Sequence, residues 1–519
     1  MLEIIAFFCG GAVMTLEMTG SRILAPYLGG SVLVWTALIG VILAFLSVGY
    51  WLGGKLADNS PDIKKLAGII LAAAFSVLGI GLFHYGLLGA VSELGFRTEF
   101  GAVIASVILF GPASLLLGMV SPYIVRVALH LRNTPVEKSG ELIGRFAALS
   151  AIGSIAGTFL GGYFFISWVG SRLTVYMIAT LLMLVSLLTL FAGRLSFKTN
   201  KLIFIAPLLG FAACMFFGGM QFFVEYEELR RGIVKTDTRY SHILVMDVKT
   251  AEGRVRRQLH TPPNLVQSAM YLDAPTALAL NYTRHYALAW QLLPQAERFL
   301  MLGGAGYSIP KYLLQTRTDI RLDVVEIDEQ VTELARKYFA LKDDPRLKIY
   351  HEDARTYLNR YKGEGYNIIM GDTFSSAYNI PFQLSTVECA RAIYASLSAD
   401  GLFISNIISA VAGDKSELLQ AISASFEEVF PEVHIYPVSY PTQGDRVQNV
   451  MLLAFKQKTA LPGAEELQKR GPLPAFTTAE LDTASFMLKN EWRVRLMQKL
   501  PAMHDDFAPV ERYALPLMD

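Results

Sequence analysis

The chain has 519 residues, of which 53% are hydrophobic, and its mean hydropathy is +0.38. Soluble domains contain about 45–50% apolar residues, and the excess here lies in the first 223 residues. A net charge of +1 gives no electrostatic basis for nucleic-acid binding, so we expect no such partner. The three cysteines lie far apart in the sequence, which predicts neither a disulfide framework nor a metal site.

Seven stretches in the N-terminal part are long and apolar enough to cross a bilayer, which takes about 20 residues for each helix. Their succession predicts an all-α transmembrane bundle over residues 1–223, with the lipid bilayer as a partner. Gly153, Gly157 and Gly161 recur every four residues, which predicts close packing of two helices on that face. Glu17 and Arg22 lie at membrane depth, where they could pair or line a site. The seven stretches are 4–27, 32–54, 65–89, 101–123, 145–168, 172–193 and 201–222.

The charges of the loops predict an orientation in the membrane. Lysine and arginine lie mainly in the loops on the side of the N-terminus, and the positive-inside rule makes that side cytoplasmic. Seven spans then bring the chain out on the opposite side, where a domain that uses a cytosolic nucleoside is not expected. A miscounted span, an exception to the rule or an outward-facing domain would each resolve this conflict. We therefore predict a multi-pass protein of the cell membrane and leave open which side the soluble domain faces.

The composition changes sharply after the last apolar stretch. Residues 224–265 are predicted to form a charged linker (225–235) and a small β-structure with strands at 240–249 and 253–260. From 266 to 460, strands alternate with helices, which predicts a Rossmann-like, methyltransferase-type α/β domain with a parallel sheet. The tail, 461–519, is predicted to be a helical extension with an amphipathic helix at 486–500. The predicted strands are 298–302, 322–327, 347–350, 366–371, 401–407, 432–437 and 449–455, and the first predicted helix is 276–292.

One stretch of this domain has the order strand, glycine turn, helix, strand and acid. Phe299–Leu302 is a short apolar run, and the glycines after it allow a tight turn and close approach of a ligand. A helical segment and a second apolar run, Leu322–Ile327, lead to Glu326 and Asp328. This order is typical of nucleoside-binding βαβ units, in which the acid accepts hydrogen bonds from ribose hydroxyls. The glycines are Gly303, Gly304 and Gly306.

Two further acids follow later strands of the same predicted sheet. Asp353, together with the amide of Ala354, suits the exocyclic amine and a ring nitrogen of adenine. Asp372 follows the fourth strand, where a carboxylate can orient an amine nucleophile or take a proton from it. Because ligands of such sheets bind beyond the carboxyl ends of the strands, all these groups are expected at one edge.

Six motifs resemble, in order and spacing, those of the polyamine aminopropyltransferases (spermidine synthases), in the form fused to a multi-span membrane domain. They are RYSHILVM, GGAGYS, VVEID, HEDAR, NIIMGDTFS and SYPTQG, between about Arg239 and Lys456. The resemblance implies transfer of a 3-aminopropyl group from decarboxylated S-adenosylmethionine, the co-substrate, to a small putrescine-like or other amine. Methylthioadenosine would be released without a metal, and a homodimer is possible.

The resemblance also implies roles for individual residues. Asp372 would be the catalytic acid that positions and deprotonates the amine, assisted by Tyr440. The acceptor would contact Tyr282, Thr283 and Ser375. The co-substrate would be bound by Ser241, Gly303, Gly304, Gly306, Glu326, Asp353 and Ala354.

Four positions depart from the family pattern. The family has an acid where this chain has Ala305 and a second acid at Ser375, and it has glutamine at Ser241 and at Thr283. Most groups that would recognise an ammonium are therefore missing, so an apolar or larger amine acceptor is an alternative to putrescine. A second hypothesis for the function is a methyltransferase that uses intact S-adenosylmethionine. A membrane transporter or sensor with a non-catalytic nucleoside-binding domain is a third.

Overall fold

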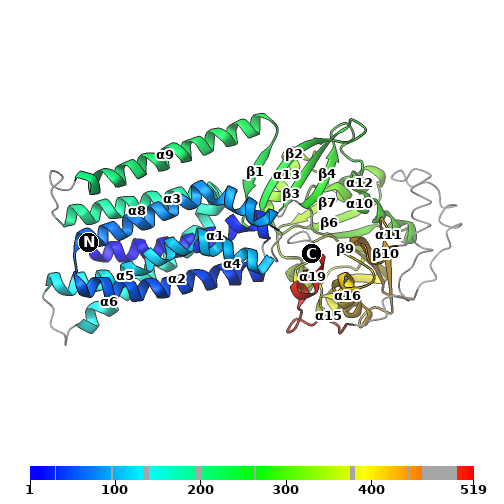
Figure 1. Ribbon diagram of the computed structural model, residues 1–519. Coiled ribbons are helices and arrows are strands. Elements are labelled where there is room, and N and C mark those ends of the chain that lie inside the picture. Colours follow the sequence, from blue (N-terminus) through cyan, green and yellow to red (C-terminus); the bar gives the residue numbers. More distant parts are fainter. Residues whose placement is uncertain are drawn as a thin grey trace. The chain divides into compact units, whose positions relative to one another are not determined.

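The computed structural model describes residues 1–29, 31–94, 98–132, 139–193, 201–261, 265–373, 380–440, 443–458 and 500–518. The chain forms two compact units, Met1–Ile243 and Leu244–Asp519, which are described separately below (Figure 1). Ser375 and almost all of the predicted amphipathic helix at 486–500 lie outside the described residues.

The first unit is a bundle of long apolar helices (Figure 1). Seven helical segments of the described part are long and apolar enough to cross a membrane, which agrees with the predicted number. The helices are α1 (Leu2–Leu28), α2 (Val32–Asn59), α3 (Ile63–Glu93), α4 (Thr98–Leu109), α5 (Gly111–Arg132), α6 (Ser139–Leu160), η2 (Gly161–Phe165), α7 (Ile166–Val169), α8 (Ser171–Ala192) and α9 (Lys201–Arg230).

Two predictions for this unit were wrong in their boundaries. The fourth span is not 101–123, because α4 ends at Leu109 and a new helix begins at Gly111. Pro112 explains the break, since proline is tolerated in the first turn of a helix but not in its interior. The predicted linker at 225–235 is helical as far as Arg230, because its glutamates are good helix formers despite their charge. A short strand, β1 (Val234–Asp237), follows.

The glycine-rich face of α6 packs directly on α1, as predicted. A Cβ atom at Gly153 would lie 1.9 Å from the carbonyl oxygen of Phe7, and one at Gly157 would lie 2.3 Å from that of Gly11. The Thr15 hydroxyl donates to the Gly157 carbonyl at 3.1 Å. These small residues let the two backbones touch, the usual basis of helix association in lipid.

The two charged residues at membrane depth in α1, Glu17 and Arg22, have different surroundings. Glu17 is buried within the unit. The Arg22 guanidinium donates to the backbone carbonyl of Arg239, at the end of the same unit.

In the second unit, three antiparallel strands precede the α/β domain: β2 (His242–Lys249), which begins at the division between the units, β3 (Val255–Thr261) and β4 (Leu265–Tyr271). The sequence predicted two strands of this sheet and missed β4.

The main sheet has seven strands in the order β10-β11-β9-β8-β5-β6-β7. They are β5 (Arg298–Leu302), β6 (Arg321–Val325), β7 (Leu347–Tyr350), β8 (Tyr366–Gly371), β9 (Leu397–Ser409), β10 (Glu432–Pro437) and β11 (Gln448–Phe455).

The predicted α/β class is confirmed, but the sheet is mixed and not wholly parallel. The strands β5 to β9 are parallel, whereas β11 runs antiparallel to β9 and β10 antiparallel to β11. No crossover helix separates β10 from β11 in the described part, and a short connection joins antiparallel neighbours.

Helices cover both faces of the main sheet (Figure 1). Leu300 and Leu302 of β5 pack with α14 (Ala354–Arg360), α15 (Val387–Ser396), α16 (Glu417–Glu427) and α19 (Val510–Met518). Phe299 and Met301 alternate with these leucines along β5 and are also buried. Because successive side chains of a strand point to opposite faces, they face the other side of the sheet, which α12 (Ser308–Thr316) and α13 (Glu329–Tyr338) cover. The first predicted helix, 276–292, is two short helices, α10 (Asn281–His285) and α11 (Ala287–Leu292).

Candidate active site

The glycine turn lies where the order of the strands reverses. The chain passes from β5 to β6 and β7 on one side and later returns to β8 on the other side of β5. The backbone amide of Gly303 donates to the carbonyl of Val325 in β6 at 2.9 Å. The backbone amide of Asp372, which follows β8, donates to the carbonyl of Leu302 at 2.9 Å, so the strands on both sides of β5 hold the turn. Such switch points are the usual ligand-binding crevices of open α/β sheets.

Only glycine fits at the first position of this turn. Gly303 has φ +93°, and a Cβ atom there would lie 2.3 Å from the carbonyl oxygen of Asp372. Gly306 is also in close contact, since its Cβ would lie 2.5 Å from the Ser268 hydroxyl oxygen. Between them, Ala305 adopts φ +45°, a left-handed conformation that few side chains take. The turn therefore presses its backbone against the end of β8.

Glu326 holds the glycine turn from the end of β6. Its Oε2 accepts from the amides of Gly304 at 2.8 Å and Ala305 at 3.2 Å, and its Oε1 accepts from Asp328 at 3.0 Å. Burial raises the pKa of this carboxyl group, and the three backbone amides oppose the rise. Each carboxylate oxygen can accept more than one hydrogen bond, so hydroxyl groups of a ligand can be added to these contacts.

Asp353 and Ala354 lie at the start of α14, after β7. The Asp353 carboxylate caps this helix by accepting from the amide of Thr356 at 2.9 Å. Gln383 donates to its other oxygen at 3.4 Å. The Asp353 carboxylate can cap the helix and also accept a hydrogen bond from adenine, because a carboxylate has about four acceptor positions.

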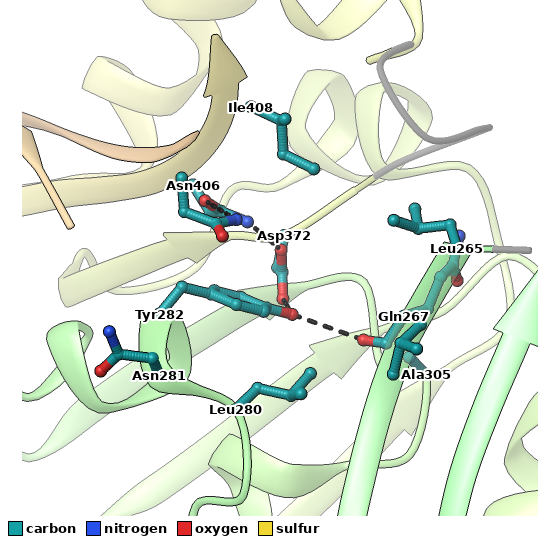
Figure 2. Close-up of a pocket in the computed structure, with 11 residues that line it drawn as sticks. Leu265, Gln267, Leu280, Asn281, Tyr282, Ala305, Asp372, Asn406 and Ile408 are labelled. Atoms are coloured by element: carbon teal, nitrogen blue, oxygen red, sulfur yellow. Dashed lines mark hydrogen bonds between the residues drawn. The ribbon is translucent and has the colours of Figure 1, made fainter. Parts of the chain in front are cut away.

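Asp372 is enclosed by donors at the end of β8. The Tyr282 hydroxyl donates to Oδ2 at 3.0 Å, and the side-chain amide of Asn406 donates to Oδ1 at 3.4 Å (Figure 2). Asn449 donates to the side-chain oxygen of Asn406 at 3.0 Å, which turns the Asn406 NH₂ group toward the carboxylate. Burial raises the pKa of Asp372 from 3.8 to about 6, although both of its hydrogen bonds lower it. The group is thus a stronger base than an ordinary aspartate and is still mostly ionised at neutral pH.

A pocket of about 210 Å³ opens beside Asp372 (Figure 2). Tyr282 and Ala305 contribute to its wall, so the pocket connects the glycine turn with the carboxylate. The other lining residues are Leu265, Val266, Gln267, Leu280, Asn281, Asn406, Ile408 and Asn449. A carboxylate with a raised pKa in a concave site is suited to general base chemistry on a small molecule.

The structure does not bring every predicted site residue to this pocket. The Tyr440 ring packs against the guanidinium of Arg446, 3.8 Å from the ring centre, and no described contact joins its hydroxyl to Asp372. The Thr283 hydroxyl donates to the backbone carbonyl of Leu280 at 2.6 Å. Ser241 belongs to the first unit, where its amide donates to the Thr238 hydroxyl at 2.9 Å.

Sequence reasoning missed the amide pair of Asn406 and Asn449. Asn406 is 2% exposed within the apolar strand β9, and a polar residue in such a run was the available signal. Tyr286 was also missed: its hydroxyl accepts from the backbone amide of Asn406 at 3.1 Å and donates to the backbone carbonyl of Gly371. It thereby joins the last residue of β8 to Asn406 within β9.

Comparison with known proteins places this chain among aminopropyl-transferring enzymes. The spermine/spermidine synthase domain matches residues 285–461. A polyamine aminopropyltransferase of Vibrio vulnificus is 32% identical over 247 residues, which cover 47% of this chain and 79% of that protein. One of Streptococcus pneumoniae is 26% identical and covers 49% of this chain and 94% of that protein. A crystal structure of a probable spermidine synthase from Corynebacterium glutamicum has a TM-score of 0.41 at 20% identity, over 51% of this chain and 93% of that one. Because the Vibrio protein is matched over most of its length at this identity, the chain belongs to the polyamine aminopropyltransferase family of enzymes.

Proposed function

We propose that the chain is a membrane-bound aminopropyltransferase that moves a 3-aminopropyl group from decarboxylated S-adenosylmethionine to an amine and releases methylthioadenosine. The observation that carries this proposal is the buried Asp372 carboxylate, held by Tyr282 and Asn406 beside the glycine turn. Family membership supports group transfer over the transporter or sensor, and aminopropyl transfer over methyl transfer.

The proposed domains are a transmembrane bundle (1–223), a connecting segment with a small β-structure (224–265), the catalytic domain (266–460) and a C-terminal extension (461–519). The connecting segment begins with the end of α9, which reaches Arg230. The seven apolar helices support placement in the cell membrane. The match to the family model covers residues 285–461, so the fusion to a membrane bundle is part of the proposal. A reporter fused after Asp519 would identify the side on which the chain ends.

On the nucleoside side, Glu326 would accept hydrogen bonds from the ribose hydroxyls. Its position fits, because it follows β6 and already fixes the amides of the turn. Asp353 and the amide of Ala354 would contact the adenine at the end of β7. The turn itself would lie against the nucleoside and leave the sulfonium near Asp372.

On the amine side, Asp372 would accept a proton from the incoming ammonium group and hold the resulting amine in line with the reacting carbon. The lone pair of the amine nitrogen then forms a bond to the methylene carbon of the 3-aminopropyl group that is attached to sulfur. The C–S bond breaks, its electron pair neutralises the sulfonium, and methylthioadenosine leaves. The product carries the positive charge as a secondary ammonium, and Asp372 returns its proton to water.

The remaining predicted residues would act around this centre. Tyr282 would orient both the carboxylate and the amine, since its hydroxyl already donates to Asp372. Tyr440 would assist at the amine, and Ser375 would border the acceptor. Thr283 would shape the segment that carries Tyr282, because its hydroxyl binds the Leu280 carbonyl.

The decisive experiment is a donor and product assay on the purified full-length protein in detergent. Decarboxylated and intact S-adenosylmethionine are each incubated with a panel of primary amines. Methylthioadenosine formed with the decarboxylated donor supports the proposal. Adenosylhomocysteine from the intact donor would instead indicate a methyltransferase.

A further inference from the structure

The last described segment of the chain, 500–518, belongs to the core of the C-terminal unit, although it lies beyond residues 285–461, which match the family model. Helix α19 places Tyr513 and Leu517 in the same apolar core as buried residues of α14 and α15. Helix α14 begins directly after Asp353. The segment therefore packs with a helix whose start carries a residue of the proposed nucleoside site.

A short stretch before α19, Met503–Asp505, is fastened to the start of α15. The backbone amide of Val387 donates to the carbonyl of Met503 at 2.8 Å. The Thr386 hydroxyl donates to Oδ1 of Asp505 at 2.7 Å, and the backbone amide of Asp505 donates to Oε2 of Glu388 at 3.0 Å. These contacts fix the point at which the chain enters α15.

Arg355, near the start of α14, connects Asp505 with the adenine side of the proposed site. Its Nη2 and Nη1 donate to the two carboxylate oxygens of Asp505 at 2.7 and 3.2 Å, and Nη1 also donates to the backbone carbonyl of Gln383 at 2.9 Å. The Arg355 side chain is only 13% exposed, and such a two-pronged contact with a carboxylate is among the stronger hydrogen-bonded pairs in proteins. The side chain of Gln383 in turn donates to Asp353 at 3.4 Å, which completes a continuous chain of contacts.

We propose that Asp505 is a positioning residue of the nucleoside site: through Arg355 it holds Gln383 against Asp353, so that the Asp353 carboxylate faces the adenine. This inference rests on the proposed function. Asp353 caps α14 with one oxygen and accepts from Gln383 with the other, so the orientation of the carboxylate depends on both contacts. Without the Asp505 carboxylate, the Arg355 guanidinium loses its charged partner and no longer holds the backbone of Gln383 in one place.

The test is Asp505→Asn in the full-length protein in detergent. We expect the Kd of methylthioadenosine, measured by calorimetry, to rise about tenfold, because a hydrogen bond to a charged group contributes roughly that factor or more. KM for decarboxylated S-adenosylmethionine should rise by about the same factor while kcat stays unchanged, since contacts to the adenine act equally in the ground state and in the transition state. A residue that only stabilised the fold would change neither the Kd nor the KM of the folded protein.

Asp344→Asn is the matched control. Asp344 makes the same kind of paired contact with Arg346, at 2.9 and 2.7 Å, but it precedes β7 and so lies at the opposite end of that strand from Asp353. This variant should keep the wild-type Kd and KM. Arg355→Lys is a second test, which also decides if Asp505→Asn does not fold. It keeps the positive charge but not the two-pronged contact, and should raise the Kd of methylthioadenosine about threefold.

The possible results separate the positioning role from the transfer reaction. An unchanged Kd of methylthioadenosine in Asp505→Asn, or a fall in kcat at unchanged KM, overturns the positioning role and leaves aminopropyl transfer intact. Wild-type affinity in Arg355→Lys would contradict the route through Arg355. If the wild type forms no methylthioadenosine with any donor and amine, the transfer is refuted, and the Kd comparison still decides on Asp505. A wild type that does not bind methylthioadenosine refutes both.

Discussion

Replacing Asp372 by asparagine should abolish turnover and, above pH 6, make the C-terminal unit more stable. Burial raises the pKa of this carboxyl group from 3.8 to about 6. An unfolded chain loses the proton near pH 4 and the folded chain near pH 6, so the free energy of unfolding falls between these values as pH rises. A difference of two pKa units means that the buried charge destabilises the folded unit by about 3 kcal/mol, and the variant removes this charge. The variant also weakens one hydrogen bond, which costs about 1 kcal/mol of stability. Asp372→Asn should therefore stabilise the unit by about 2 kcal/mol at pH 7 and by almost nothing at pH 4.

Hydrogen exchange of the full-length protein in detergent measures this difference. Amides of β5 and β8 should be protected about 30-fold more in the variant at pH 7, because 1.4 kcal/mol corresponds to a factor of ten. Asp343→Asn is the matched control, since the Asp343 side chain is 91% exposed and should change neither protection nor turnover. Lower protection in Asp372→Asn at pH 7, or methylthioadenosine formation at the wild-type rate, would refute the reasoning.

The same site leads to three further predictions. In the wild type, kcat/KM should rise with pH through about pH 6, as Asp372 loses its proton, and then level off; a flat profile from pH 5 to 7 would contradict a catalytic carboxylate. Tyr282→Phe removes a hydrogen bond that lowers the Asp372 pKa, so this rise should move to higher pH, and an unshifted profile would argue against the contact. Gly303→Ala places a Cβ 2.3 Å from a carbonyl oxygen at φ +93°, and should weaken methylthioadenosine binding by about tenfold or more in calorimetry. An unchanged Kd would show that the turn does not contact the nucleoside.

Local patterns in the sequence determined much of this protein. Twenty-residue apolar runs predicted seven long helices, because a helix that faces lipid or apolar neighbours has few charged residues. Alternating apolar runs and turns predicted all seven strands of the main sheet, six of them to within two residues at each end, whereas β9 is longer than predicted at both ends. The acids after β6, β7 and β8 were predicted as a group, because parallel strands end at a common edge.

Other features depend on groups that are distant in sequence, and only the tertiary structure decided them. A hydropathy pattern does not reveal the helix break before Gly111, because the residues on both sides of it are apolar. It also does not reveal that β10 and β11 are antiparallel, because a buried strand is apolar in either direction. Asp372 lies 34 residues from Asn406 in sequence, and Asn406 lies 43 from Asn449, yet they form one hydrogen-bonded chain. The raised pKa of Asp372 follows from its burial beneath these partners, and burial is a property of the assembled sheet, which no local pattern of residues contains.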